Sequence, residues 1–206
     1  MPGSLDDFPL FPLGLVLLPG ELLPLHIFEE RYKTMIDVCV EQERDFGVIW
    51  LSDDGLQDIG CSARITEIIE RMHDGRINIL TRGEQPFRLL RRIDALAYPA
   101  GEIELVDDPE EEADGGLAAA TRGQYADLVE RATGSRPSAG EVAEMDAYAM
   151  AGTIELPRDA KQRLLEQRSE RKRLAAVADL FTASRERIDR AELASERAQT
   201  NGHVQT

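Results

Sequence analysis

The chain opens with an apolar stretch that prolines interrupt at short intervals. Within "LGLVLLPGELLPLHIFEERY" (residues 13–32), aliphatic and aromatic side chains dominate until the charged residues near its end. Proline lacks a backbone donor, so it belongs at strand ends and turns. The pattern therefore predicts two short buried strands, residues 10–18 and 22–27. A turn at Pro19-Gly20 joins them, because proline presets a negative φ and glycine accepts a positive one.

The following segments alternate between helical and strand periods. Apolar side chains from Phe28 to Val40 recur every three or four residues, which predicts a helix over residues 29–42. "FGVIWLS" (46–52) predicts a buried strand, and residues 59–106 predict a meander whose first hairpin turns at Asp74-Gly75. So many short strands in residues 1–106 favour a closed or half-closed barrel, because closure removes exposed edges.

The pattern becomes helical after an acidic segment, "DDPEEEADGG" (107–116), which we interpret as a solvated linker. Helices are predicted over residues 117–132 and 169–194. Two more are predicted between them, one that starts at a capping box formed by Ser138 and Glu141 and one that starts at Pro157. They form a four-helix bundle within 117–198, and 199–206 is predicted to be a disordered tail. The predicted fold class is α+β, an N-terminal mixed barrel followed by a C-terminal bundle.

Charge and composition narrow the function classes. The formal net charge is −15, with 10 Lys/Arg against 19 Asp/Glu in residues 1–106 and six acids without a base in 107–116. This balance disfavours nucleic-acid phosphates and anionic lipid surfaces as partners. Prolines break the apolar run below a membrane span, and no basic residue precedes Arg31, so neither a membrane anchor nor a signal peptide is predicted. With only two cysteines, we expect a reducing cytoplasmic location.

Few residues suggest chemistry. Cys39 and Cys61 could be nucleophiles, but nothing places a histidine beside them, so they are interpreted as buried thiols. Paired acids such as Asp53-Asp54 adjoin in sequence and have no histidine close by, so no metal site and no cofactor are predicted. The basic runs Arg91-Arg92 and Arg171-Lys172-Arg173 lie near acids and are interpreted as solvated faces.

One strand-to-helix junction combines several kinds of side chain: His26, Glu29, Arg31 and Tyr32. They could form a ligand-facing rim. The alternative, which the pattern favours, is a structural junction with Glu29 at the helix start and Tyr32 buried. Phe87 and Arg88 complete the set of candidate peptide-binding residues.

Specific motifs in this order resemble the N-terminal substrate-binding domain of the ATP-dependent protease La, the Lon protease, and its free-standing bacterial relatives. The likeness covers about residues 8–190 and includes "FPLFPLGLVLLPGELLPLHIFEERYKTMI", "FGVIW", "IGCSARITEIIERMHDGRINILTRGEQPFRLL" and "LPRDAKQRLLEQRSERKRLAAVADLF". Its structural motif residues are Pro12-Leu13, Pro19-Gly20, Pro24-Leu25, Phe28, Gly60, Asp74-Gly75 and Gly83.

The resemblance implies a PUA-like barrel and a polypeptide-recognition function. The sequence contains no G-x-x-x-x-G-K-[ST] phosphate loop, and it leaves no room for the family's Ser–Lys protease domain. We therefore expect no catalytic residues. The expected activity is binding of unfolded or extended polypeptides by apolar burial, with an edge strand as an additional contact and a AAA+ protease as a candidate partner. The alternatives are a PUA-like RNA or small-ligand module, a cysteine or serine hydrolase, and an assembly module; the oligomeric state is left open.

Overall fold

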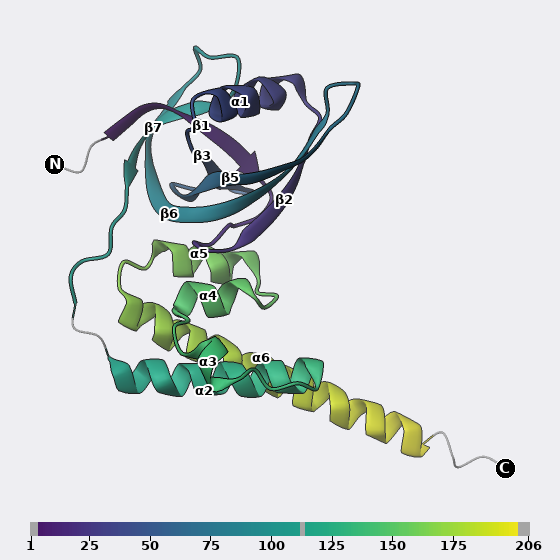
Figure 1. The fold of residues 1–206 in the computed structure, drawn as a ribbon. Coiled ribbons are helices and arrows are strands. Elements are labelled where there is room, and N and C mark those ends of the chain that lie inside the picture. The colour runs from purple at the N-terminus through teal and green to yellow at the C-terminus, as the bar shows by residue number, and fades with distance from the viewer. Residues whose placement is uncertain (1–3, 112–113, 202–206) are drawn as a thin grey trace. The chain divides into compact units, whose positions relative to one another are not determined.

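The computed structural model describes residues 4–111 and 114–201. The chain forms two compact units, which are described separately: unit 1 holds Met1–Glu111 with Ala151–Ser169, and unit 2 holds Glu112–Met150 with Glu170–Thr206. Unit 1 is built on a seven-stranded mixed sheet (Figure 1). Its elements are β1 (Ser4–Leu13), β2 (Leu22–Ile27), α1 (Glu30–Glu41), β3 (Phe46–Ser52), β4 (Gly55–Leu56), β5 (Ile59–Arg71), β6 (Ile77–Ile93), β7 (Ala100–Leu105) and α5 (Arg158–Glu166).

The sheet of unit 1 closes on itself. Five strands follow one another in the order β1–β7–β6–β5–β3, and β3 returns to β1 through a parallel pairing that sets Leu10 opposite Gly47. The other pairings around this ring are antiparallel. β2 adds to β6, and β4 adds to β3. Closure satisfies both edges of the ring strands and confirms the predicted mixed barrel.

A fully buried phenylalanine organises the barrel core. Phe87 packs edge-on against Phe8, with ring centroids 5.9 Å apart, and shares a cluster with Leu10, Ile49 and Ile103. The ring lies against two glycines. A Cβ atom at Gly47 or Gly60 would lie 2.6 or 2.5 Å from the Phe87 ring, closer than carbon atoms pack. Gly60, a motif residue, therefore makes room for this ring.

Two strand boundaries differ from the prediction. β1 begins at Ser4 because its first half pairs with β7, and it ends at Leu13. Residues 14–18, predicted to be strand, bury Val16, Leu17 and Leu18 without joining a ladder, since apolar runs of this length do not specify a strand. Within the predicted meander, β6 is a single 17-residue strand that continues through Gly83 and Pro86.

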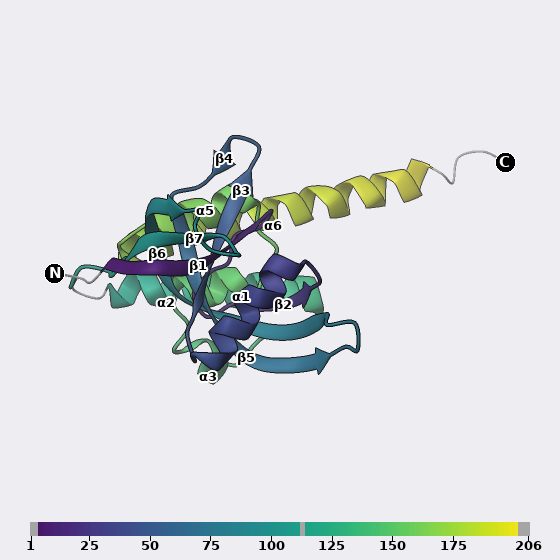
Figure 2. The same cartoon turned by 90° about the horizontal axis from the view of Figure 1, so that it is seen from above.

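Both predicted turns are confirmed. Glu21 N donates to the carbonyl of Leu18 (3.1 Å), with Pro19 and Gly20 at the turn centre and Gly20 at φ 80°. This is a type II turn, in which proline and glycine take their preferred positions. At the other turn, Gly75 has φ 81°, and the β5–β6 hairpin projects from the barrel at this point (Figure 2).

Helix α1 buries Tyr32, Met35, Ile36 and Cys39 on one face, as the periodicity predicts. Phe28, which the same periodicity placed on this stripe, is 60% exposed. The reason is that α1 begins at Glu30, so Phe28 precedes the helix and its direction does not follow the helical repeat.

Unit 2 is helical. Its elements are α2 (Gly115–Thr133), α3 (Ala139–Val142), α4 (Ala147–Gly152), which crosses the unit boundary, and α6 (Glu170–Asn201). α2 packs on α6 through Tyr125 and Phe181, and Arg131 pairs with Asp189 at 2.6 Å. The capping box at Ser138 and Glu141 is present, but the helix that it opens ends at Val142.

The compact units differ from the predicted domain boundaries, which placed all of 117–198 in the bundle. Residues 151–169 belong to unit 1 instead. Lys161 Nζ on α5 pairs with Glu21 Oε1 at 2.5 Å, and Gln162 Nε2 donates to the Ile59 carbonyl (3.1 Å). Within the predicted linker, 107–116, helix α2 already begins at Gly115. The predicted tail begins inside α6, and residues 202–206 lie outside the described residues.

Candidate functional site

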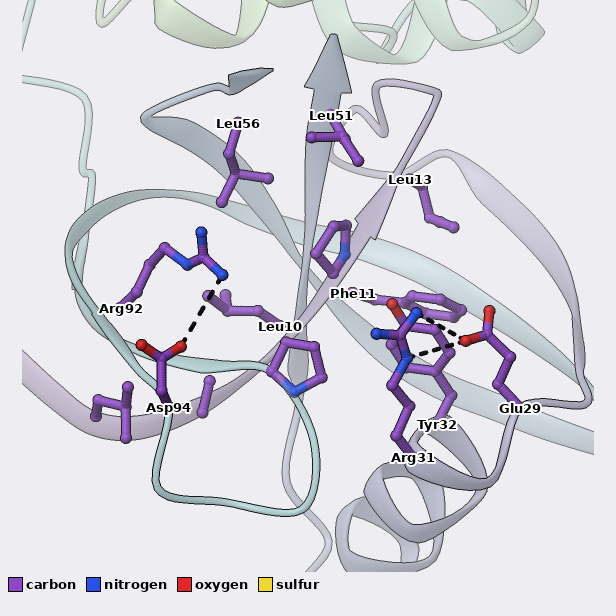
Figure 3. A pocket seen from close by; sticks show the side chains of 14 residues that line it. Leu10, Phe11, Leu13, Glu29, Arg31, Tyr32, Leu51, Leu56, Arg92 and Asp94 are labelled. Carbon is purple, nitrogen blue, oxygen red and sulfur yellow. Dashed lines mark hydrogen bonds and ion pairs between the residues drawn. The ribbon is translucent and has the colours of Figure 1, made fainter.

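A pocket of about 360 Å³ opens on unit 1 where β1, the start of α1, the β3–β4 turn and the β6–β7 connection meet (Figure 3). Its walls are mostly aliphatic, with charged residues at two ends. The lining residues are Leu10, Phe11, Pro12, Leu13, Glu29, Arg31, Tyr32, Leu51, Leu56, Arg92, Ile93, Asp94, Pro99 and Ala100. The arrangement suits an apolar group flanked by polar ones, the usual character of a ligand site.

Aromatic stacking fixes one end of the pocket. The rings of Phe11 and Tyr32 lie 4.2 Å apart, and the Arg31 guanidinium lies 4.7 Å above the Tyr32 ring. Arg31 also contacts Oε2 of Glu29 through Nη2 at 2.7 Å and Nε at 2.9 Å. Burial raises the pKa of Tyr32, so its hydroxyl is neutral near pH 7. Three of the predicted junction residues therefore line the pocket together.

His26, the fourth junction residue, lies outside the pocket. It lies on β2 directly opposite Asn78 of β6, and its Nδ1 donates a hydrogen bond to Oδ1 of Asn78 (2.6 Å). The ring stacks on exposed Phe28, with centroids 6.0 Å apart. His26 belongs to β2, where it pairs with β6, whereas Glu29, Arg31 and Tyr32 lie at the start of α1.

The remaining two candidates also lie elsewhere. Phe87 is fully buried in the barrel core and cannot contact a ligand, which corrects the prediction. Arg88, the next residue on β6, is exposed opposite Glu104 and borders a separate recess of about 120 Å³ beside Arg168. The prediction gave both residues the same role, but neighbouring strand residues face opposite sides.

Most of the lining residues were not among the candidate binding residues. They include Leu51 and Leu56 on the β3–β4 hairpin, Arg92 near the end of β6 and Asp94 just after it. Leu51 and Leu56 are cross-strand partners. The Asp54-Gly55 dipeptide between them is a hairpin signal that could have placed them side by side. Arg92 and Asp94 carry no such local signal, since only barrel closure brings them near β1.

The titratable groups in the lining are the carboxylates of Glu29 and Asp94, the guanidinium groups of Arg31 and Arg92, and the Tyr32 phenol. Among the described residues that line the pocket, none is serine, threonine, cysteine or histidine. Over residues 4–111 and 114–201, no group of three or more His, Cys, Asp or Glu side chains could hold a metal ion. In the same part of the chain, no helix combines the length and apolar character needed to cross a membrane.

Both cysteines are buried free thiols, as predicted. Burial is the main cause that raises the pKa of Cys39 to about 11, and burial also raises the pKa of Cys61. In the unfolded chain a thiol ionises near about pH 8.5. Between that pH and the folded value, the unfolded state binds fewer protons than the folded state, so stability falls as pH rises.

We therefore expect Cys39→Ala to lose less stability than the wild type between about pH 8.5 and pH 11, because it lacks one thiol whose ionisation favours unfolding. Urea unfolding at several pH values in this range measures the difference. An equal loss in both proteins would contradict the assignment. Exposed Ser135→Ala serves as a control, since this position does not titrate in the range.

Comparison with known proteins identifies the family. The family model of the ATP-dependent protease La (LON) substrate-binding domain matches residues 7–183. The chain belongs to this family. Among curated relatives, the Lon protease of Paraburkholderia phytofirmans is 27% identical over 98% of the chain and 27% of its own length. The Lon protease of Anaeromyxobacter dehalogenans is 25% identical over 86% of the chain and 23% of its own length. The chain thus spans about a quarter of these relatives.

Solved structures show the same fold. The Lon N-terminal domain protein from Xanthomonas campestris is 26% identical, with a TM-score of 0.64 over 83% of this chain and 96% of that one. The N-terminal domain of a Mycobacterium avium complex Lon protease is 21% identical, with a TM-score of 0.66 over 86% and 98% of the two chains. At the lower identity the likeness concerns the fold alone. The predicted family resemblance is confirmed.

Proposed function

We propose that this chain binds unfolded or extended polypeptide segments and that the pocket between β1, α1 and the β3–β4 hairpin receives an apolar side chain of the bound segment. The supporting observation is the lining of the pocket, which surrounds about 360 Å³ with aliphatic and aromatic groups. Membership of a substrate-binding family agrees with this role. Burying one large apolar side chain contributes roughly 1.5–3 kcal/mol. Binding is therefore weak and tolerant of sequence.

Side-chain burial, rather than strand addition to β2, carries the interaction. The Glu21 carbonyl accepts from Gly83 N on β6 (2.9 Å), so alternate residues from Glu21 face β6. Pro24 then directs its nitrogen to the other edge of β2, where it cannot donate. A proline in the middle of an edge blocks pairing with a further strand. We therefore do not propose that a bound polypeptide pairs with the free edge of β2, although the sequence led us to expect a contact through an edge strand.

We infer that the chain itself performs no catalytic step. The sequence has no phosphate-binding loop, and the described lining of the pocket includes no hydroxyl or thiol nucleophile apart from the Tyr32 phenol, whose raised pKa keeps it protonated. Purified protein should hydrolyse neither ATP nor peptides. A AAA+ protease is the proposed recipient of bound segments, because the relatives matched along the chain are Lon proteases.

Leu51→Asp should weaken binding of a peptide with a phenylalanine–leucine anchor about tenfold or more, because it places a charge in the apolar wall. Leu51 is 52% exposed, so stability should change little. The matched control is Leu90→Asp: Leu90 is 49% exposed on β6 and lies outside the pocket. Fluorescence anisotropy with a labelled, blocked peptide measures both affinities.

Equal affinities for wild type and Leu51→Asp would contradict the proposed site. Binding of a single-stranded RNA oligonucleotide that weakens with added salt, without peptide binding, would instead favour the RNA-binding alternative. Urea unfolding of each variant, followed by the fluorescence of Trp50 on β3, confirms that the barrel is intact.

A further inference from the structure

The two charged ends of the pocket are neutralised to different degrees. At one end Arg31 makes two contacts shorter than 3 Å with Glu29 and stacks over Tyr32. At the other end, Nη2 of Arg92 lies 4.0 Å from Oδ1 of Asp94, and the two side chains are 68% and 90% exposed. Figure 3 shows these pairs on opposite sides of the apolar wall.

This asymmetry decides which end can accept a charged group from a ligand. Arg31 would have to give up a close carboxylate and its ring contact before it could bind another anion. Among the described residues, Arg92 has only the long, exposed ion pair with Asp94, and such pairs contribute little because water screens them. A carboxylate from a ligand can therefore replace Asp94 beside Arg92, because little interaction free energy is lost when the Arg92–Asp94 pair separates. Its approach also partly shields the guanidinium from water, which strengthens the contact.

We propose that the pocket prefers polypeptide segments in which an acidic residue lies within a few residues of the apolar anchor, so that the acid meets Arg92 while the anchor fills the aliphatic wall. This inference rests on the proposed function, since it assigns a substrate class to the same pocket. Arg92 is thus a specificity-determining residue. The preference arises locally, because the net charge of −15 opposes acidic ligands at long range.

Blocked, fluorescein-labelled peptides with a phenylalanine–leucine anchor test the preference in the full chain. The anchor is followed or preceded by aspartate, asparagine or lysine. In low salt, wild type should bind one of the aspartate peptides about three- to fivefold tighter than its lysine counterpart. Arg92→Gln should remove this difference, and Asp94→Asn should enlarge it.

Arg91→Gln is the matched control because it changes the net charge equally. Arg91 pairs with Glu102 at 3.3 Å and lies outside the pocket, so this variant should keep the preference. Equal binding of the aspartate, asparagine and lysine peptides by wild type, in both arrangements, would overturn the inference. The inference would also fail if Arg92→Gln and Arg91→Gln both lost the preference, or if both kept it. Each of these results leaves peptide binding intact and therefore differs from failure of the proposed function, in which no anchored peptide binds or Leu51→Asp has no effect.

Discussion

Phe87→Ala is expected to lower the free energy of unfolding of the barrel by about 3–5 kcal/mol. The ring is fully buried, meets Phe8 edge-on, and fills the space that two glycines, Gly47 and Gly60, leave open. Removing the Phe87 side chain leaves a cavity. The barrel strands cannot move inward to fill this cavity, since each of them is paired on both sides. Urea unfolding monitored at Trp50, the only tryptophan in the chain, reports on this unit.

The control for this prediction is Phe28→Ala. Phe28 is 60% exposed, so its removal should change the stability by less than about 0.5 kcal/mol. Comparing Phe87→Ala with Phe28→Ala also tests whether Phe87 is a core residue rather than a peptide-binding residue. If Phe87→Ala kept wild-type stability but lost peptide binding, the residue would be a binding residue after all. We expect instead that Phe87→Leu, which retains much of the buried volume, binds peptide normally.

Gly83→Ala is expected to destabilise the barrel by about 2–4 kcal/mol. A Cβ atom at this position would overlap the carbonyl oxygen of Leu18 and lie 3.2 Å from Sγ of Cys61. The turn at Leu18–Glu21 must then move away from β6. That movement breaks two hydrogen bonds, from Gly20 N to the Gly83 carbonyl (2.8 Å) and from Gly83 N to the Glu21 carbonyl (2.9 Å).

Gly14→Ala is the matched control, because no atom outside the adjoining residues lies within 4 Å of a Cβ at that position. It should leave the stability within about 0.5 kcal/mol of the wild type. The same urea titration at Trp50 measures both variants. A neutral result for Gly83→Ala would show that the Pro19-Gly20 turn does not depend on its contact with β6. The motif glycine would then need another explanation.

The local elements were predictable where periodicity and turn chemistry agree. β3 matches its predicted range of 46–52, β2 matches 22–27, and α1 differs from its prediction by one residue at each end. The turns at Pro19-Gly20 and Asp74-Gly75 follow from the backbone preferences of proline and glycine. These features depend on neighbours in sequence, so the chain encodes them locally.

The candidate site was predictable only in part. Glu29, Arg31 and Tyr32 are close in sequence and lie at the start of α1, with Glu29 at the N-cap, so a local pattern could group them. Arg92 and Asp94 join them from a distant part of the sequence, because β6 runs through the barrel and β7 returns beside β1. His26 was grouped with them by proximity in sequence, but it lies on β2 opposite Asn78 of β6, and no residue of β2 lines the pocket.

By itself, the sequence determined the family, the strand and helix types, the buried thiols and the sharp turns. The tertiary structure decided which apolar side chains are accessible. It buried Phe87 and exposed Leu51 and Phe28, although all three are large apolar residues. It also assigned α5 to the barrel unit through Lys161 and Gln162. The physical reason is that the hydrophobic effect favours burial without specifying which residues come into contact. Closure of the barrel determines those contacts, and it brings together residues that are distant in sequence.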